Sequence, residues 1–229
     1  MSTGPMIDGD FPTMDEHTEP QWSRSAVVTI DVQRDFTLSG APFRIPGTEE
    51  ALPDMQRLLI AFRAAFRPII HVVRFYLPDG SNADPCRRKA ISDGLTMAAP
   101  GTPGADLVDE LPPRNADALD CSLLMAGRPQ QIASNEWVIY KPRFGAFYQT
   151  CLEDLLHALG VTTLVVIGCN FPNCPRTTIY EATERDFRVV AVHDAISGVY
   201  ERGMEELRNI GVVVLSADQT LESIKSLTR

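Results

Sequence analysis

The second half of the chain alternates short apolar runs with helical patterns, and this alternation constrains the fold more than any other feature. Each run has strand length and is rich in β-branched residues, and each following segment carries apolar residues at helical spacing. The predicted strands are 137–140, 163–168, 188–193 and 212–216, and the predicted helices are 152–159, 174–186, 203–210 and 219–227. Strands joined by helices form right-handed crossovers in a parallel sheet. The sequence therefore predicts an α/β fold: a doubly wound, mostly parallel sheet with helices on both faces, in three layers.

The first half begins the same sheet and then changes character. A buried strand is predicted at 25–31, a helix at 49–66 and a second strand at 68–75. Residues 77–135 are polar and rich in proline, glycine and charge. A compact domain rarely holds so long an irregular stretch, so we expect short helices within it, at 106–111 and 117–126.

Length and composition fit one domain. A chain of 229 residues with 44% hydrophobic content can bury one large core. We therefore predict a single domain over residues 25–229. It is preceded by an arm, residues 1–24, in which Phe11 and Trp22 are candidate anchors.

The charge of the chain argues against several partners. Its formal net charge is −9, whereas nucleic-acid binding requires a basic surface. No apolar run reaches the length of a membrane span, and the first twenty residues lack the basic and apolar regions of a signal peptide. We expect a cytoplasmic protein that acts on a small molecule, with neither nucleic acid nor membrane as a partner.

The cysteines and histidines do not predict a metal or a disulfide framework. The five cysteines form no CxxC pair, and the four histidines show none of the spacings HxH, HxxxH or HExxH. The glycine-rich loops that bind nucleotide phosphates are also missing from the sequence. We therefore predict no metal and no cofactor.

Three ionisable residues follow predicted strands. Asp31 closes the run SAVVTID, Lys141 follows the strand 137–140, and Cys174 lies between the run LVVIG and a helix. Open α/β sheets bind their ligands at the carboxyl ends of the strands. Each residue alone has an ordinary alternative: an Asp after a strand is often a turn residue, and a lone Cys is often a small buried hydrophobe. Lys141 is harder to dismiss, because the chain has three lysines and eighteen arginines.

Three longer segments join these residues into one hypothesis. VVTIDVQRDF, VIYKPRFGAFYQTCLEDLLHALGVTTLVVIGC and NCPRTTIYEATERDFRVVAVHDAISG resemble, in order and spacing, the motifs of the isochorismatase-like cysteine hydrolases. That family includes nicotinamidases, N-carbamoylsarcosine amidase and ureide amidohydrolases, and it commonly forms dimers or tetramers. The resemblance runs from about residue 25 to 221 and implies a catalytic triad of Asp31, Lys141 and Cys174. Cys174 fits the nucleophile better than Cys169, because CPRTT matches the small-residue and Thr stretch that opens a helix.

The resemblance implies covalent hydrolysis of an amide or ureide. Cys174 would attack the carbonyl carbon, and Asp31 would move the thiol proton to the leaving amine before water cleaves the thioester. The helix N-terminus and Lys141 are expected to favour the thiolate of Cys174. The resemblance also implies an oxyanion hole made by the backbone amides of Asn170 and Cys174, with a cis peptide bond between Cys169 and Asn170.

The substrate pocket is less defined by sequence. Its candidate residues are Gln33, Phe36, Arg74, Phe147 and Phe171. Arg74 leaves the second strand at the same sheet edge and would suit a substrate carboxylate, although a surface Arg on a solvated loop is an equal alternative. Gln33 and Asp35 are predicted either to orient the loop after Asp31 or to be solvent-facing turn residues.

Other functions remain open at this stage. An isochorismatase proper would cleave a vinyl ether by acid catalysis on Asp31, but a Cys nucleophile favours amide hydrolysis. A haloacid-dehalogenase-type phosphatase needs a second acid two residues after Asp31, where this chain has Gln33. A non-catalytic doubly wound binding module is the third alternative. Nicotinamide is a disfavoured substrate, because nicotinamidases carry an Asp and paired His after strand two and the stretch 74–84 contains no His. The stretch 115–131 resembles an insertion of undetermined role.

Overall fold

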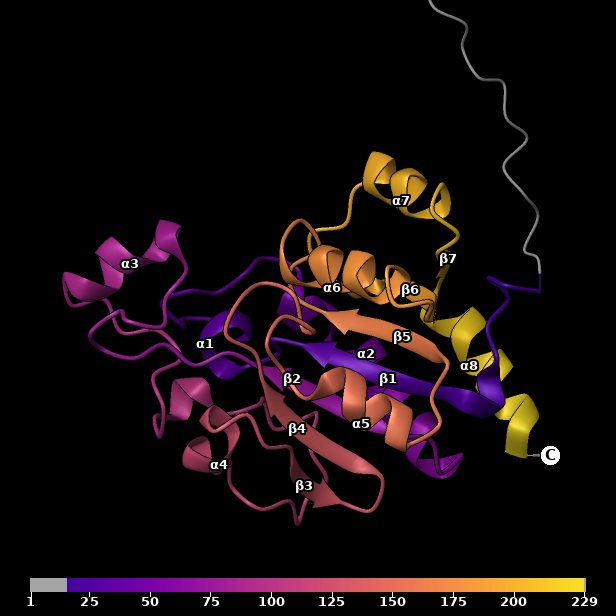
Figure 1. Cartoon of the computed structure of the whole chain (residues 1–229), viewed down its shortest axis with the longest axis horizontal. Helices are drawn as coiled ribbons and strands as arrows, with labels where there is room; N and C mark the ends of the chain where they lie inside the picture. The colour runs from indigo at the N-terminus through magenta and orange to yellow at the C-terminus, as the bar shows by residue number, and fades with distance from the viewer. Residues whose placement is uncertain (1–15, 229) are drawn as a thin grey trace, which may run out of the picture.

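The seven strands form one sheet whose order differs from their order along the chain (Figure 1). A computed structural model describes residues 16–228 of the protein. The strands are β1 (Ser25–Ile30), β2 (Ile69–Val73), β3 (Gln130–Ala133), β4 (Glu136–Tyr140), β5 (Thr163–Gly168), β6 (Arg188–Ile196) and β7 (Val213–Leu215). Their order is β3-β4-β2-β1-β5-β6-β7, and every pair of neighbours is parallel except β3 and β4. The predicted fold class is confirmed.

Helices cover both faces of the sheet. One face packs against α2 (Thr48–Ala64) and α8 (Ala217–Lys225). The other packs against α5 (Leu152–Ala158), α6 (Cys174–Thr183) and α7 (Glu201–Arg208). The shorter elements are η1 (Trp22–Arg24), α1 (Arg34–Thr37), α3 (Pro85–Ser92), η2 (Pro103–Ala105), α4 (Cys121–Met125) and η3 (Ser226–Thr228). Figure 1 shows α3 beyond the carboxyl ends of β1 and β5, apart from both helical layers.

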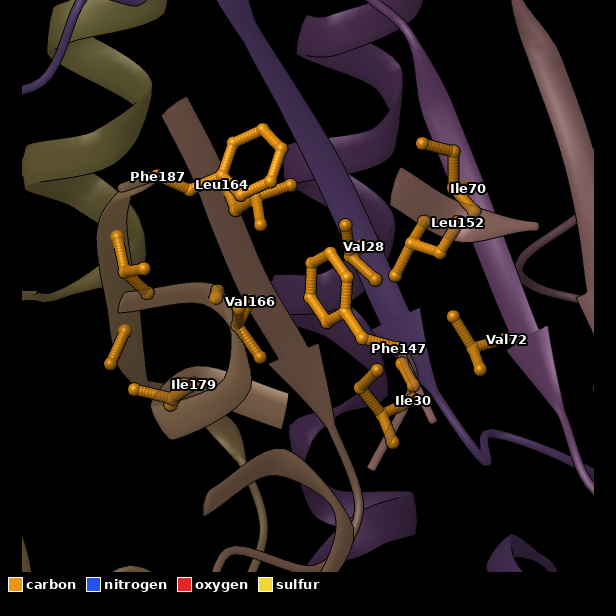
Figure 2. Packing of buried hydrophobic residues seen from close by; sticks show 14 of the residues in the cluster. Val28, Ile30, Ile70, Val72, Phe147, Leu152, Leu164, Val166, Ile179 and Phe187 are labelled. Atoms are coloured by element: carbon orange, nitrogen blue, oxygen red, sulfur yellow. The ribbon is translucent and has the colours of Figure 1, made fainter. Parts of the chain in front are cut away.

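The two-sided cover explains the uninterrupted apolar runs in the sequence. Every residue of β1 and of β5 is buried, as expected for central parallel strands. Figure 2 shows Val28 and Ile30 of β1 packed near Phe147 and Leu152 on the face that α5 and α6 cover. Each such aliphatic side chain contributes about 1.5–3 kcal/mol by leaving water. The strands that precede Asp31 and the loop to Cys174 are therefore packed on both faces.

The polar stretch 77–135 contains the main differences from the sequence prediction. The predicted helix at 106–111 is wrong: Leu107 forms an antiparallel bridge with Gln33, and the Val108 N–H donates to the carbonyl of Val32. This backbone is paired with the loop after β1 and so cannot form a helix. The sequence prediction also missed α3, although its Asp84-Pro85 start is typical of a helix N-terminus.

Part of the predicted arm, residues 1–24, lies outside the described residues. That part is 1–15, and it includes Phe11. Within the described part, the Gln21 N–H donates to Thr163 Oγ1 of β5. Trp22 packs against the core face formed by α2 and α8. The described end of this segment is thus attached to the domain. Within residues 16–228 no helix combines the length and the apolar character needed to cross a membrane.

A buried polar network links the three strands that bring Asp31 and Lys141 together. Glu136 of β4 is 1% exposed and accepts hydrogen bonds from Arg63 of α2, at 2.9 and 2.7 Å, and from His71 Nε2, at 2.8 Å. A carboxylate only accepts, so Nε2 of His71 carries a proton, and Nδ1 of His71 forms a hydrogen bond with Thr29 Oγ1 at 2.9 Å. The network therefore fixes β1, β2 and β4 to one another and to α2.

We predict that Glu136→Gln destabilises the protein by roughly 2–4 kcal/mol at neutral pH, because one partner of a buried charge pair is removed. Burial raises the pKa of Glu136, but hydrogen bonds from Arg63 and His71 lower it, and the pKa stays below its ordinary value of 4.5. The stabilisation is therefore complete above about pH 4.5 and is lost as pH falls through the lower folded-state pKa. Urea unfolding of wild type and Glu136→Gln at neutral and acidic pH measures the difference in their free energies of unfolding. The exposed Glu222→Gln on α8 is the control, and a difference between Glu136→Gln and wild type that does not shrink at acidic pH would contradict the assignment.

Candidate active site

Asp31, Lys141 and Cys174 meet at the carboxyl edge of the sheet. Lys141 Nζ lies 2.9 Å from Asp31 Oδ2 and 3.3 Å from Cys174 Sγ. A third contact, 3.1 Å to the carbonyl oxygen of Arg143, completes the set of acceptors around the ammonium. The three residues come from the ends of β1 and β4 and from the start of α6. They are brought together because parallel strands end at the same edge.

The local backbone at two of these strand ends is unusual. Asp31 has φ +53°, a left-handed conformation that Asp tolerates better than most residues. Gly168, the last residue of β5, has φ +121°, and a Cβ there would lie 2.4 Å from the carbonyl oxygen of Ile30. Only glycine permits this close approach of β5 to β1. The sharp exits from β1 and β5 direct Asp31 and the loop before Cys174 toward each other.

The electrostatics of the site give a charged lysine and a neutral thiol. Burial by itself would lower the pKa of Lys141, but Asp31 and Cys174 raise it above its usual value. Burial, and then the Asp31 carboxylate, raise the pKa of Cys174 to about 12, although Lys141 opposes this. The expectation that the helix N-terminus and Lys141 hold Cys174 as a thiolate is therefore wrong for the resting site. The lysine charge is already balanced by Asp31.

Asp31 has one carboxylate oxygen free to act as a base. Its Oδ2 pairs with Lys141, whereas Oδ1 is buried and has no hydrogen-bond partner among residues 16–228. A buried, unpartnered acceptor is costly unless a ligand or a reaction uses it. The base role predicted for Asp31 therefore falls to Oδ1, and it stays a prediction.

The predicted oxyanion donors lie in the loop between β5 and α6 and at the first residue of α6. The peptide bond between Cys169 and Asn170 is cis, as the resemblance implied. Asn170 and Cys174 donate none of the backbone hydrogen bonds found in the described residues, whereas the Phe171 N–H donates to the Ser197 carbonyl. Both backbone amides are thus available, and their role as an oxyanion hole stays a prediction.

Helix α6 also positions the loop that follows Lys141. Thr178 Oγ1 accepts from the Ala146 N–H at 3.1 Å, and Glu181 Oε2 accepts from the Phe147 N–H at 2.9 Å. A Cβ on Gly145 would lie 2.2 Å from Glu181 Oε2, so this contact requires glycine. The nucleophile and the loop that supplies the third acceptor to Lys141 are therefore held by one helix. Sequence patterns did not single out Thr178 or Glu181.

The predicted pocket residues lie near the triad but mostly inside the core. Phe147 is 5% exposed and Phe171 is fully buried, and both belong to the apolar cluster that contains Cys174. Phe36 is also buried, in the cluster beneath the polar stretch 77–135. In Figure 2 the ring of Phe147 points into the sheet core beside Val28. These three rings are therefore part of the apolar core that supports the site.

Gln33 and Asp35 both hold neighbouring backbone. Gln33 Nε2 donates to the carbonyls of Arg74 and Ala105, and Gln33 Oε1 accepts from the Arg74 N–H. Asp35 Oδ2 accepts from the Ala98 N–H at 2.7 Å. The two side chains attach the loop after β1 to the end of β2 and to the segment around η2. These contacts favour the loop-orienting interpretation over solvent-facing turn residues.

A second polar group, which the sequence analysis missed except for Arg74, lies over the triad. We call it the arginine cluster: Arg74, Tyr76, Asn82, Asp84, Arg87 and Arg143. Tyr76 Oη donates to Asp84 Oδ2 at 3.0 Å and accepts from Arg87. Burial, opposed by the neighbouring arginines, raises the pKa of Tyr76 to about 12, so its hydroxyl stays a donor. The Asp84-Pro85 start of α3 is the sequence signal by which this region could have been found.

Cavity volume alone does not identify the site. A cavity of about 550 Å³ lies between Arg34, Asp109, Arg114 and Ile132, and no triad residue lines it. No group of three or more His, Cys, Asp or Glu within residues 16–228 is arranged to hold a metal ion. The converging acid, cation and thiol define the candidate site instead.

Comparison with known proteins agrees with this geometry. A family model described as the isochorismatase domain matches residues 25–120 and 126–219. The chain belongs to the isochorismatase family. The residues between the two matched stretches are those of α4, inside the predicted insertion at 115–131. The family that the sequence motifs indicated is therefore confirmed.

Individual relatives cover most of the chain. A probable inactive nicotinamidase of Arabidopsis thaliana is 30% identical, over 84% of this chain and 92% of its own length. An N-carbamoylsarcosine amidase of Arthrobacter sp. is 28% identical, over 90% of this chain and 73% of its own length. The crystal structure of an isochorismatase family protein from Desulfovibrio vulgaris superposes with a TM-score of 0.75 at 34% identity and covers 89% of this chain and 98% of that one.

We predict that Asp31→Asn speeds alkylation of Cys174 at neutral pH. Removing the carboxylate leaves Lys141 as the nearest charge, so the pKa of Cys174 falls and more thiolate forms; a fall of one pKa unit gives roughly a tenfold faster reaction. Iodoacetamide labelling followed by peptide mapping measures this. In wild type, exposed Cys86 should react before Cys174. Cys86 is also the internal control, because its rate should be equal in both proteins. Slower labelling of Cys174 in Asp31→Asn would contradict the assignment.

Proposed function

We propose that the protein is a cysteine-dependent hydrolase that cleaves a C–N bond, an amide or a ureide, of a small molecule through a thioester intermediate. The observation that carries the proposal is the position of one buried ammonium between an acid and a thiol: Lys141 lies within 3.3 Å of both Asp31 and Cys174. The names of the amidase relatives support the reaction class. Asp31, Lys141 and Cys174 are the proposed catalytic residues.

The first half-reaction forms the thioester. Cys174 Sγ attacks the carbonyl carbon while the thiol proton moves to Asp31 Oδ1, which has no partner in the described residues. The C–S bond forms, and the carbonyl oxygen becomes an oxyanion that the Asn170 and Cys174 N–H groups stabilise. The proton on Asp31 then passes to the leaving nitrogen, and the C–N bond breaks with release of the amine.

The second half-reaction regenerates the thiol. A water molecule gives a proton to Asp31 and attacks the thioester carbonyl, and the proton returns to sulfur as the C–S bond breaks. The ammonium of Lys141 stays charged throughout and stabilises Asp31 as a carboxylate and Cys174 as it ionises. Because the resting thiol is neutral, the base and the nucleophile act in one step, as in other triads.

Other functions fit the geometry less well. Vinyl-ether hydrolysis by acid catalysis on Asp31 gives no role to the Cys174 thiol, which lies 3.3 Å from Lys141 Nζ. A non-catalytic module is suggested by the relative named as probably inactive. A buried charge pair beside a thiol is, however, an expensive arrangement for a protein that only binds. A cytoplasmic location and a homo-oligomeric state remain predictions.

Ammonia release is the direct test of the proposal. We expect release from at least one member of a panel of ureides, N-carbamoyl amino acids and simple carboxamides, and loss of that release in Cys174→Ala. Acid quenching during turnover should reveal a covalent adduct by intact mass in wild type. Cys86→Ala, which removes an exposed cysteine, is the matched control. Turnover that persists in Cys174→Ala would exclude the cysteine mechanism.

We predict that Lys141→Arg is nearly as damaging as Lys141→Ala, although it retains the charge. Lys141 is 1% exposed and its three acceptors match the three N–H bonds of an ammonium. A planar guanidinium is broader and would move Asp31 and Cys174 apart. A displacement of about 1 Å costs roughly a hundredfold in rate. Steady-state rates on a substrate found by the panel compare the two variants, and an Arg variant that keeps most of the activity would remove Lys141 from the triad.

A further inference from the structure

Positive charge is concentrated on one side of the candidate nucleophile. The arginine cluster holds three guanidiniums and one carboxylate, Asp84, whose Oδ2 lies 3.8 Å from both Arg74 Nη2 and Arg87 Nη1. Arg143 joins the cluster through a hydrogen bond from its Nη1 to the Asn82 carbonyl at 3.1 Å. Lys141 and Asp31 neutralise each other, so they do not offset this excess of positive charge. The cluster therefore favours a negatively charged group in the space beside Cys174.

Arg74 lacks a free edge of two nitrogens to bind that group, because only its buried Nε has no hydrogen-bond partner among the described residues. Its Nη1 donates to the Phe75 carbonyl at 2.6 Å and to Tyr140 Oη at 3.1 Å, and its Nη2 donates to the Asn82 carbonyl at 2.7 Å. The side chain is 2% exposed and lies 4.1 Å from the centre of the Tyr76 ring. Arg74 thus acts as a structural link between the end of β2 and the loop before α3. The carboxylate-binding role that the sequence suggested for Arg74 therefore falls to another arginine of the cluster.

Arg87 has the free edge that a carboxylate needs. Its side chain is 31% exposed, and its Nη1 donates to Tyr76 Oη. Its Nε and Nη2 donate no hydrogen bond within the described residues, and this edge of a guanidinium binds a carboxylate through two parallel bonds. The guanidinium lies between two rings, 5.6 Å from the centre of Tyr76 and 5.3 Å from the centre of Phe144. The side chain is thus fixed in orientation before a ligand binds.

Arg87 also lies on the side of the site that faces Cys174. Phe144, one of the two rings beside it, packs against the apolar cluster that contains Cys174. The residue before Phe144, Arg143, accepts a hydrogen bond from Lys141 Nζ through its carbonyl oxygen at 3.1 Å, and the same Nζ lies 3.3 Å from Cys174 Sγ. In Figure 1, α3 lies beyond the carboxyl ends of β1 and β5. A small molecule held at Cys174 can therefore reach Arg87.

We propose that Arg87 is the anchor for a carboxylate on the substrate, so that the protein acts on amides or ureides that carry a carboxylate. Tyr76 is the positioning residue that holds Arg87, and Asp84 holds Tyr76. The inference rests on the proposed function, because it assigns the substrate class of the same site. It places specificity in α3, an element outside both helical layers of the fold.

Matched pairs of substrates test the inference. Succinamate is compared with butyramide, and N-carbamoylglycine with ethylurea, since a methyl group replaces the carboxylate in the second member of each pair. We expect wild type to have a higher kcat/KM for the acid in at least one pair. Arg87→Gln should lower this acid-to-neutral ratio roughly thirtyfold, about 2 kcal/mol at 1.4 kcal/mol per tenfold, as for a charge-assisted hydrogen bond. Arg87→Lys keeps the charge without the bidentate edge, so its acid-to-neutral ratio should lie between those of wild type and Arg87→Gln.

The neighbouring residue supplies the control. Arg88 is exposed, its Nη2 donates to the Ala83 backbone carbonyl at 3.3 Å, and within the described residues it pairs with no side chain of the cluster. Arg88→Gln removes the same charge from the same helix and should leave the ratio at its wild-type value. An equal ratio in wild type and Arg87→Gln, or a wild-type preference for the neutral analogues, would overturn the inference while leaving the proposed hydrolysis intact.

A binding measurement separates the inference from catalysis. Succinate binding to wild type, Arg87→Gln, Arg87→Lys and Arg88→Gln is measured by calorimetry, which requires no turnover. We expect the Kd of Arg87→Gln to be weaker by roughly thirtyfold, with Arg88→Gln unchanged. If wild type binds succinate but shows no turnover, and Arg87→Gln no longer binds succinate, the result would support Arg87 as the anchor and count against the proposed function. Absence of succinate binding by wild type, or equal Kd values in all four proteins, would overturn the anchor.

Discussion

The buried ammonium of Lys141 is the interaction on which the rest of the site depends. An unpaired ammonium inside a protein costs several kcal/mol, and Lys141 is 1% exposed. The structure compensates with the Asp31 carboxylate, the Cys174 thiol and the Arg143 carbonyl. These three groups cannot move independently without exposing or unpairing the charge. The same contacts that make the lysine tolerable therefore fix the acid and the thiol at reacting distance.

The sheet and its buried polar network supply the rigidity that this arrangement needs. Lys141 reaches Asp31 from β4 across β2, so the register of three strands decides whether the two meet. Glu136 and His71, with Arg63 and Thr29, connect those strands through hydrogen bonds deeper in the sheet. On the other side, α6 holds both Cys174 and the loop after Lys141. The site is thus preorganised by elements whose apolar faces are fully packed.

The segment between β2 and β3 has a different role from the sheet. Its polar side chains form the arginine cluster together with Arg143 from the loop after β4, while its backbone is held by Gln33 and Asp35 from the loop after β1. The fold is therefore shared with the family, whereas the charge near the proposed nucleophile is set by α3 and the loops around it. Such a division lets one catalytic arrangement accept different substrates through changes in a single segment.

The sequence by itself determined the parallel α/β fold, the family and the three residues that meet at the sheet edge. It did so because apolar runs of strand length alternate with helical patterns, and because parallel strands end at one edge. Tertiary structure alone decided the pairing of 105–108 with the loop after β1, the neutral state of the Cys174 thiol and the choice between Arg74 and Arg87. These depend on burial and on contacts between residues far apart in the chain, such as Gln33 with Arg74 and Arg87 with Tyr76. A pKa or a free guanidinium edge is set by what surrounds a group in space, which local periodicity does not encode.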